Sequence, residues 1–326
     1  MRFSLATFNV ENLDSTPDSG ERDAALRPLL EQLDADVLCL QEVNAQGRHA
    51  GQESRRLAAL DRLLAGSRFA GYARIVTLND AGTDLRDVHN LVILSRFPVL
   101  RHEQIRHRHV PPPAWQVLTA LPPMAEPTRL QWDRPLLLAT LELGLSRPLH
   151  VLNLHLRAPL PVAIAGRKLG PFAWSDTRAF AEGCCLAEFK RAAQALEARL
   201  AVDALFDADP AALIAVAGDY NAGSLEAPTV LIACDAIDTG NPALAGRALR
   251  PVEARLPAAK RFTVRHGGEA LMLDHLLVSN ALAAGLTAAE VLNEGLADEL
   301  LDYLFGRRSA RGHHAPVVAR FDLAAG

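Results

Sequence analysis

The pattern of hydrophobic and polar positions is clearest in one stretch near residue 215. Residues 213–217 (LIAVA) are all apolar, which predicts a strand that is buried on both of its faces. Gly218 ends this run and allows a tight turn, because glycine tolerates backbone angles that other residues avoid. We therefore expect the Asp219 carboxylate and the Asn221 amide to lie together at the carboxyl end of a rigid strand.

The same kind of pattern divides the rest of the chain into short apolar runs and amphipathic segments. Apolar residues at helical spacing predict helices over residues 21–33, 51–65, 177–203, 226–234 and 296–305. Asp176 precedes the longest of these and is a candidate N-cap. Apolar runs predict further strands over residues 2–10, 36–40, 73–78, 90–95, 98–101, 136–143, 150–156, 261–264, 271–279 and 314–322.

One segment, from about residue 101 to residue 127, has little periodicity. It contains three arginines, three histidines and six prolines, so we expect an irregular surface insertion. This insertion is either a solvated basic loop or a substrate-facing patch that binds phosphate. No repeat, low-complexity tract or linker divides the sequence, and we expect a single domain over residues 1–326.

Composition adds few constraints. A hydrophobic content of 49% with 22% charged residues is ordinary for a soluble globular protein. The net charge of −4 gives no overall attraction to nucleic acid, so a polyanion would have to meet a local patch or a bound cation. The four cysteines lack metal-ligand spacing, and no signal segment or membrane span is visible. These features predict a cytoplasmic protein.

Polar residues follow or adjoin the apolar runs at six places. For a single histidine such as His155, a hydrogen-bonded core residue is the commoner interpretation. Six such strand ends with carboxylates, amides and imidazoles together indicate a cation site, because buried carboxylates are costly unless they are paired or bind metal. Oxygen-rich ligands without cysteine suit Mg²⁺ or Mn²⁺. The six pairs are Asn9/Glu11, Gln41/Glu42, Asn153/His155, Asp219/Asn221, Asp274/His275 and His313/His314.

Seven short motifs occur along the chain: TFNVENL (7–13), LQE (40–42), LVILSRFP (91–98), NLH (153–155), GDYN (218–221), LDHL (273–276) and HHAPV (313–317). In this order they resemble the motifs of the endonuclease/exonuclease/phosphatase superfamily, the metal-dependent phosphoesterases with a deoxyribonuclease I-like fold. The resemblance implies an α/β fold with four layers, in which two mainly antiparallel β-sheets pack face to face and helices lie outside.

The resemblance also implies catalytic roles. Asp219 matches the residue that orients or deprotonates the attacking water. Asn9 matches an amide that supports the site, and Asn221 matches an amide that contacts the phosphoryl group. His155 and His314 match the two histidines that flank the phosphate.

The other matches concern residues with supporting or structural roles. Asp274 matches the carboxylate that hydrogen-bonds His314. Arg191 and Gln194, in an Arg-x-x-Gln-Ala pattern, are interpreted as structural.

The implied metal ligands include two departures from the family pattern. Glu42 matches the principal metal-binding glutamate, and Glu11 stands where many members have aspartate. The terminal motif is usually Ser-Asp-His, whereas this chain has Gly312-His313-His314. His313 as a ligand would favour softer ions such as Mn²⁺ or Zn²⁺ over Mg²⁺, or weaken the site.

Three functional hypotheses follow. The first is a metal-dependent hydrolase of phosphodiesters, in particular a nuclease that acts on DNA or RNA. The second keeps the chemistry but takes a small phosphate ester or a lipid head group, which the acidic charge balance favours. The third is a degenerate member that binds phosphate without hydrolysing it, which His313 motivates. The sequence gives no indication of a protein partner.

Overall fold

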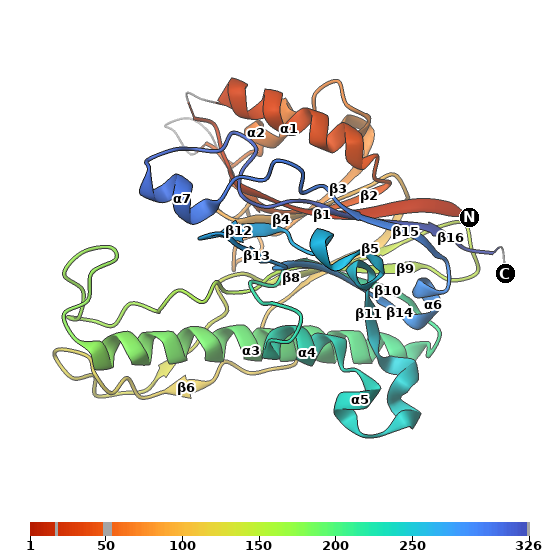
Figure 1. Cartoon of the computed structure of the whole chain (residues 1–326). Coiled ribbons are helices and arrows are strands. Elements are labelled where there is room, and N and C mark those ends of the chain that lie inside the picture. Colours follow the sequence, from red (N-terminus) through yellow and green to blue (C-terminus); the bar gives the residue numbers. More distant parts are fainter. Residues whose placement is uncertain (17–18, 48–53, 325–326) are drawn as a thin grey trace.

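The computed structural model describes residues 1–16, 19–47 and 54–324 of the chain. Two six-stranded sheets pack face to face, and helices cover their outer faces, which gives four layers (Figure 1). The predicted α/β sandwich is confirmed. In the described part of the chain, no helix is both long and apolar enough to cross a membrane.

Both sheets are mainly antiparallel, and each contains one parallel pair, β1–β2 in the first sheet and β9–β10 in the second. The first sheet has the order β15 (Leu286–Val291), β16 (Val317–Asp322), β1 (Arg2–Leu13), β2 (Val37–Val43), β4 (Asn90–Ser95) and β3 (Ala73–Val76). The second has the order β11 (Leu249–Pro251), β14 (Asp274–Ser279), β10 (Leu213–Asp219), β9 (Leu149–His155), β8 (Leu136–Leu141) and β5 (Val99–Ile105).

Strand β10 shows how the hydrophobic pattern builds the layers. Ala215 and Ala217 point into the core between the two sheets, whereas Ile214 and Val216 point outward, because successive side chains of a strand face opposite sides. The outward pair packs under α3 (Thr177–Ala208) and α4 (Ala227–Ala233). On the other sheet, α1 (Ser19–Leu33) and α2 (Ala58–Leu64) cover the outer face. Every residue of β10 is buried, as the unbroken apolar run predicts.

The remaining elements are short and lie in the connections. They are α5 (Ala236–Thr239), α6 (Asn280–Ala283), α7 (Glu299–Leu304), the two-stranded pairs β6 (Ala114–Trp115) with β7 (Thr128–Arg129) and β12 (Val264–His266) with β13 (Glu269–Leu271), and 3₁₀ turns over 68–71, 242–247, 252–255 and 258–260.

Several predicted boundaries were wrong. Helix α2 begins at Ala58 rather than near residue 51, because the Arg56 backbone pairs with Gln46 and Gln46 Oε1 accepts from Ala59 N. Residues 51–53 of that predicted helix lie outside the described residues. The strand expected over 261–264 lies at 264–266, and the terminal strand begins at Val317.

Three further segments differ from the expectations. The predicted strand 271–279 is divided between β13 and β14. Strand β15 was missed because this edge strand is half exposed and has little apolar character to mark it. Strand β5 extends to Ile105, so the irregular segment begins after that residue.

Two buried glutamates of α3 anchor this irregular segment. Glu197 accepts hydrogen bonds from the backbone of residues 107–109 and from Trp132 Nε1. Glu182 accepts from Trp115 Nε1 and from the backbone of residues 118 and 119. Within the irregular segment, Arg106 pairs with the carboxylate of Asp80, and Arg108 pairs with that of Glu103. The segment is therefore held against α3, and both of these tryptophans have packing roles.

Candidate active site

The polar strand ends of both sheets meet at one edge of the sandwich, because both parallel pairs run toward it. In the second sheet, Asp219 pairs with His155 on one side and with Asp274 on the other, so the three residues form a row. In the first sheet, Asn9 lies in register with residue 41, and Glu42 follows near the end of β2. Packing of the two sheets brings these side chains together, although they are far apart in sequence.

Asn9 links the two sheets at this edge. Its Nδ2 donates to Glu42 Oε1 at 3.3 Å and to Asp219 Oδ2 at 3.0 Å. His155 Nε2 lies 3.8 Å from the same Glu42 oxygen and 3.4 Å from the same Asp219 oxygen. Asn9, Asp219 and His155 are each at most 2% exposed. Two carboxylates thus converge on one amide and one imidazole that are almost closed to water.

His155 is neutral in this environment. Burial lowers its pKa well below the ordinary value, and the positive charge of nearby Arg134 lowers it further. A neutral imidazole carries one N–H donor and one acceptor nitrogen. Its buried Nδ1 has no hydrogen-bond partner. Nε2 is the nitrogen that faces the two carboxylates, and it can donate to them when it carries the proton.

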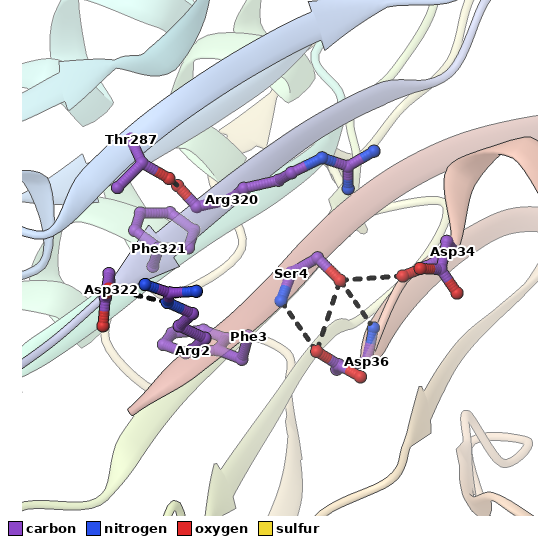
Figure 2. Close-up of a pocket in the computed structure, with 9 residues that line it drawn as sticks. All are labelled: Arg2, Phe3, Ser4, Asp34, Asp36, Thr287, Arg320, Phe321 and Asp322. Atoms are coloured by element: carbon purple, nitrogen blue, oxygen red, sulfur yellow. Dashed lines mark hydrogen bonds and ion pairs between the residues drawn. The ribbon is translucent and has the colours of Figure 1, made fainter.

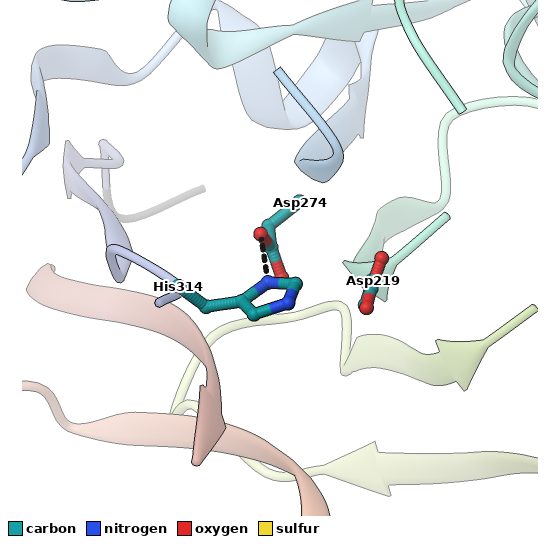
Figure 3. A group of neighbouring side chains, drawn as sticks. All are labelled: Asp219, Asp274 and His314. Carbon is teal, nitrogen blue, oxygen red and sulfur yellow. Dashed lines mark hydrogen bonds and ion pairs between the residues drawn. The ribbon is translucent and has the colours of Figure 1, made fainter. Parts of the chain in front are cut away.

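The His314 ring lies between two carboxylates (Figure 3). Its Nδ1 donates to Asp274 Oδ2 at 2.8 Å, and one polar atom each of Asp219, Asp274 and His314 lie within 4.8 Å of one another. Burial alone would lower the pKa of His314, but the charge and hydrogen bond of Asp274 outweigh it and raise the pKa well above its usual value. The ring is therefore an imidazolium, and it supplies the positive charge that this group of acids requires.

Asp219 has the environment of a base that works near neutral pH. Burial, followed by the negative charge of Asp274, raises the pKa of Asp219 to about 7. The hydrogen bonds from Asn9 and from the Asn221 backbone N–H oppose this rise. General bases are most effective when their pKa lies near the working pH.

Glu11 and His313 pair with each other. Both Glu11 oxygens accept hydrogen bonds from His313, one from its backbone N–H at 2.7 Å and one from Nδ1 at 2.9 Å. The other ring nitrogen donates to Asp302 Oδ2 at 3.2 Å. The Glu11 hydrogen bond raises the pKa of His313, which favours the protonated ring. Both ring nitrogens are hydrogen-bonded to carboxylates, so in this arrangement neither is free to bind a metal.

Asn221 is held by its own strand and by the long helix. Its backbone N–H donates to Asp219 Oδ1, and its Nδ2 donates to Leu156 O at 3.1 Å, which leaves one side-chain N–H available. Arg191 of α3 donates to the Asn221 carbonyl, and its guanidinium is anchored by Glu188. The structural role predicted for Arg191 therefore includes holding Asn221 in position.

Gly218 does not end its strand, contrary to the sequence prediction, because β10 extends through Asp219. The glycine is required for a different reason. Its φ is +147°, and a Cβ at this position would lie 1.9 Å from the Leu154 carbonyl oxygen of β9. Only glycine lets the two parallel strands approach closely enough to set Asp219 beside His155.

Several site residues have left-handed backbone angles, which non-glycine residues rarely adopt. The φ angles are 48° at Glu11, 61° at Glu42 and 49° at Asn221. The register of β1 with β2 also shifts between Asn9 and Leu13. Such conformations cost energy and persist where the surrounding structure imposes them, often at functional sites. Here they turn side chains away from regular strand directions and into the site.

Two residues of this cluster, His89 and Arg134, were not predicted from the sequence. His89 Nε2 lies 2.8 Å from Asn12 Oδ1, and its Nδ1 accepts from Arg134 at 2.9 Å. Arg134 also contacts the carbonyls of His155 and Leu156 and is held by Gln194 of α3. His89 adjoins the apolar run of β4, so the signal used elsewhere was present. Nothing in the local sequence marks Arg134.

Three of the six polar strand ends contain residues with other functions. Gln41 donates to Asn153 Oδ1 at 2.8 Å, and Asn153 donates to backbone carbonyls of the opposite sheet, so this pair joins the sheets. His275 is fully buried, bonds to Glu253 and lies 2.9 Å from the Ala222 carbonyl. These residues support the site from behind.

Comparison with known proteins identifies the family. The family model described as Endonuclease/Exonuclease/phosphatase matches residues 6–295. The chain belongs to the endonuclease/exonuclease/phosphatase family. No curated protein matches the chain in sequence.

Solved structures of this family share the fold over the whole chain. Truncated TDP2 from Caenorhabditis elegans has a TM-score of 0.58 at 16% identity, covering 99% of this chain and 98% of that one. TDP2 from D. rerio, complexed with a single-strand DNA product, has a TM-score of 0.54 at 16% identity, with 99% of each chain covered. The 3′ phosphatase NExo from Neisseria, bound to a product DNA hairpin, has a TM-score of 0.52 at 19% identity, covering 98% and 100%.

Membership of the family makes the protein a phosphoesterase, a hydrolase of phosphoric ester bonds. The family depends on divalent metal ions, and the residues present fit such an ion. Glu42 is largely buried and, among the described residues, forms no ion pair with arginine or lysine. Both histidines beside it, His89 and His155, have lowered pKa values and are neutral. A largely buried carboxylate that forms no direct ion pair with arginine or lysine is the expected ligand of a hard cation.

Proposed function

We propose that this protein hydrolyses phosphodiester bonds in nucleic acid by in-line attack of a water molecule, with Mg²⁺ or Mn²⁺ as cofactor. The observation that carries the proposal is the convergence of Glu42 and Asp219, from opposite sheets, on the Asn9 amide. This convergence supports the proposal, because Glu42 would then hold the cation beside Asp219, a candidate base with a pKa of about 7.

The cation supplies charge neutralisation when it is bound, and Glu42 would hold it, with Glu11 as a second carboxylate nearby. Asp219 takes the proton of the attacking water, since its pKa allows it to be ionised near neutral pH. In the structure, the Asn9 side-chain N–H groups and His155 Nε2 face the Glu42 and Asp219 carboxylates, and they would donate to the phosphoryl oxygens once the cation binds Glu42.

His314 and Asn221 complete the proposed phosphate cradle. The His314 imidazolium, held by Asp274, faces Asp219 and stabilises negative charge that accumulates on phosphoryl oxygens. The free side-chain N–H of Asn221 adds a neutral donor. Both groups are fixed before substrate binds, so little reorganisation accompanies the reaction.

The test measures hydrolysis of a single-stranded oligonucleotide by the full chain with Mg²⁺ or Mn²⁺. Activity should disappear when the ions are chelated and should fall about 10²–10⁴-fold in Asp219→Asn, because a positioned general base contributes that factor. Activity that survives both changes contradicts the proposed roles. Circular dichroism of the variant shows whether its fold is intact.

A small phosphate ester is the second candidate substrate. The arginines of the irregular segment are paired with carboxylates, so they do not form an open phosphate-binding stripe. Parallel turnover of the oligonucleotide, a 3′-phosphorylated oligonucleotide and a soluble phosphomonoester separates the candidates. A preference for the soluble monoester removes the nuclease proposal, and phosphate binding without turnover under Mg²⁺, Mn²⁺ or Zn²⁺ supports the degenerate member.

A further inference from the structure

Large apolar side chains are exposed on two segments that flank the candidate active site. The first segment is the loop between β9 and α3, where Leu160, Leu169 and Phe172 are 63%, 76% and 78% exposed. The second is α7, where Tyr303 and Leu304 are 68% and 64% exposed. Figure 1 shows both segments on the same side of the sandwich, on the left of the view, where β1 ends.

Both segments are tied to site residues. The loop follows β9 directly, and its Arg157 lies two residues after His155 and pairs with Asp133 at 2.5 Å. Helix α7 contributes Asp302, which accepts the hydrogen bond from His313. Tyr303 therefore lies next to a residue that contacts the site cluster.

The two segments meet through Phe172 and Tyr303. Their ring centroids are 6.3 Å apart, with an angle of 73° between the planes. We call these two rings the aromatic pair. In this edge-to-face arrangement each ring makes little contact with its partner, which leaves ring surface exposed to solvent.

The aromatic pair is held by ordered backbone. Hydrogen bonds from Leu169 N to Ala173 O and from Ala173 N to Gly170 O close a turn that carries Phe172. Asp298 caps α7 through Leu301 N and accepts from the backbone of residues 267 and 268. Exposed apolar side chains that lie together on an ordered backbone are typical of a binding surface.

Positive charges accompany these aromatic side chains. Lys168 Nζ lies 4.3 Å from the centroid of Trp174 in the loop, and Arg307 lies 5.3 Å from that of Phe305 just after α7. Aromatic rings interleaved with cations suit a single strand of nucleic acid, in which unpaired bases stack on rings and phosphates meet the cations. The alternative of a lipid surface is less favoured, because α7 has only six residues and does not form an extended amphipathic helix.

On these grounds we infer that the aromatic pair, Phe172 and Tyr303, stacks on unpaired bases next to the phosphate held in the active site. The inference rests on the proposed function and adds the requirement for single-stranded substrate. Duplex DNA does not satisfy it, since its bases are stacked on one another and do not present their faces.

The test measures binding of fluorescein-labelled ten-nucleotide probes by anisotropy with Mn²⁺, in the Asp219→Asn background so that the probes stay intact. The probes are oligothymidine, an abasic strand of equal length and a ten-base-pair duplex. Phe172→Ala and Tyr303→Ala should each weaken oligothymidine binding about five- to tenfold and leave abasic binding unchanged, because stacking requires a base. Tyr303→Phe should bind like the parent.

The matched control is Ile237→Ala, which removes a side chain 87% exposed on α5 and should change nothing. Equal losses for the thymidine and abasic probes, or no loss, overturn the inference, as does binding to phosphatidylserine vesicles that is lost in both alanine variants. Hydrolysis by the chain with wild-type Asp219 is assayed separately. Stacking as described without hydrolysis under Mg²⁺ or Mn²⁺ contradicts the proposed function and leaves the inference standing.

Discussion

The two opposite edges of the first sheet both carry clusters of polar residues, and they differ in how the carboxylates are paired. At the edge where β1 begins, a surface hollow of about 490 Å³ is lined by charged side chains (Figure 2). There Asp36 pairs with Arg96 at 2.8 Å and with Arg68 at 3.2 Å, and Asp322 pairs with Arg2 at 2.8 Å. We call this the opposite edge.

At the candidate active site, the carboxylates have other partners. Asp219 meets the Asn9 amide, a neutral histidine and the His314 imidazolium. Glu42 meets the same amide and the same neutral histidine, and Asp274 meets only the His314 imidazolium. In the described part of the chain, none of the three forms an ion pair with arginine or lysine. Asp274 Oδ1 is buried without a hydrogen-bond partner.

This difference separates a structural cluster from a reactive one. Arginine forms rigid, permanently charged pairs that fully satisfy a carboxylate. Amides and histidines leave lone pairs and titratable protons, at a cost in stability. The surface hollow at the opposite edge therefore does not mark the candidate chemistry, which instead lies where the carboxylates are incompletely neutralised.

Among the variants that compare the two edges, the largest expected effect comes from removing the positive charge of His314. His314→Ala should lower kcat about 10²–10³-fold, because a preorganised group that stabilises developing charge contributes that factor. Arg96→Ala removes a cation from the opposite edge and should leave kcat unchanged. Steady-state kinetics of both variants checks the comparison, and equal losses would show that the two edges do not differ in function.

The next effect concerns the metal. Glu42→Gln should raise the Mn²⁺ concentration that gives half-maximal activity by about tenfold to a hundredfold or more. Changes of this size are seen even for residues that only hydrogen-bond to a metal ligand. Metal titration of the activity measures the shift. Asp322→Asn at the opposite edge is the control, and an unchanged metal requirement in Glu42→Gln would contradict the ligand assignment.

The opposite edge should respond in stability instead. Asp36→Ala removes the acceptor for the backbone N–H of Ser4, which lies 2.9 Å from Asp36 Oδ2. A buried N–H without a partner costs about 1–3 kcal/mol, and the free energy of unfolding should fall by about 2 kcal/mol. Denaturant titration measures this change. Retained kcat with reduced stability supports the comparison, whereas a lower kcat in the folded variant argues against it.

The smallest effect is a pH dependence behind the site. Burial alone would lower the pKa of His275, but the hydrogen bond and charge of Glu253 outweigh it and raise the pKa. A raised pKa in the folded state contributes stability below the ordinary value of about 6.5, and this contribution is lost as the pH rises through the folded value.

In the wild type, the raised pKa of His275 should make the free energy of unfolding decline as the pH rises above about 6. Glu253→Gln should remove this part of the decline. Denaturant titrations across this pH range give the free energy of unfolding of the wild type and of the variant. The contributions of the other histidines are the same in both proteins and cancel when the two values are subtracted. Parallel curves for the two proteins would show that the pair carries no such linkage.

The sequence alone determined the layers and the order of the polar strand ends. Alternating and continuous apolar runs predict β4 at 90–95 as the structure has it, and Asp176 accepts from Arg178 N as the predicted N-cap of α3. These features are local, because side-chain periodicity and capping depend on residues within a few positions of each other.

Tertiary structure decided which polar groups meet. It pairs His313 with Glu11 and Asp302, and it places Arg134 behind His155, although no local pattern links these residues. It also shows that Gly218 is required by the neighbouring strand rather than by a turn. Contacts between distant segments depend on sheet register and on packing of the two sheets, neither of which is encoded in a short window of sequence.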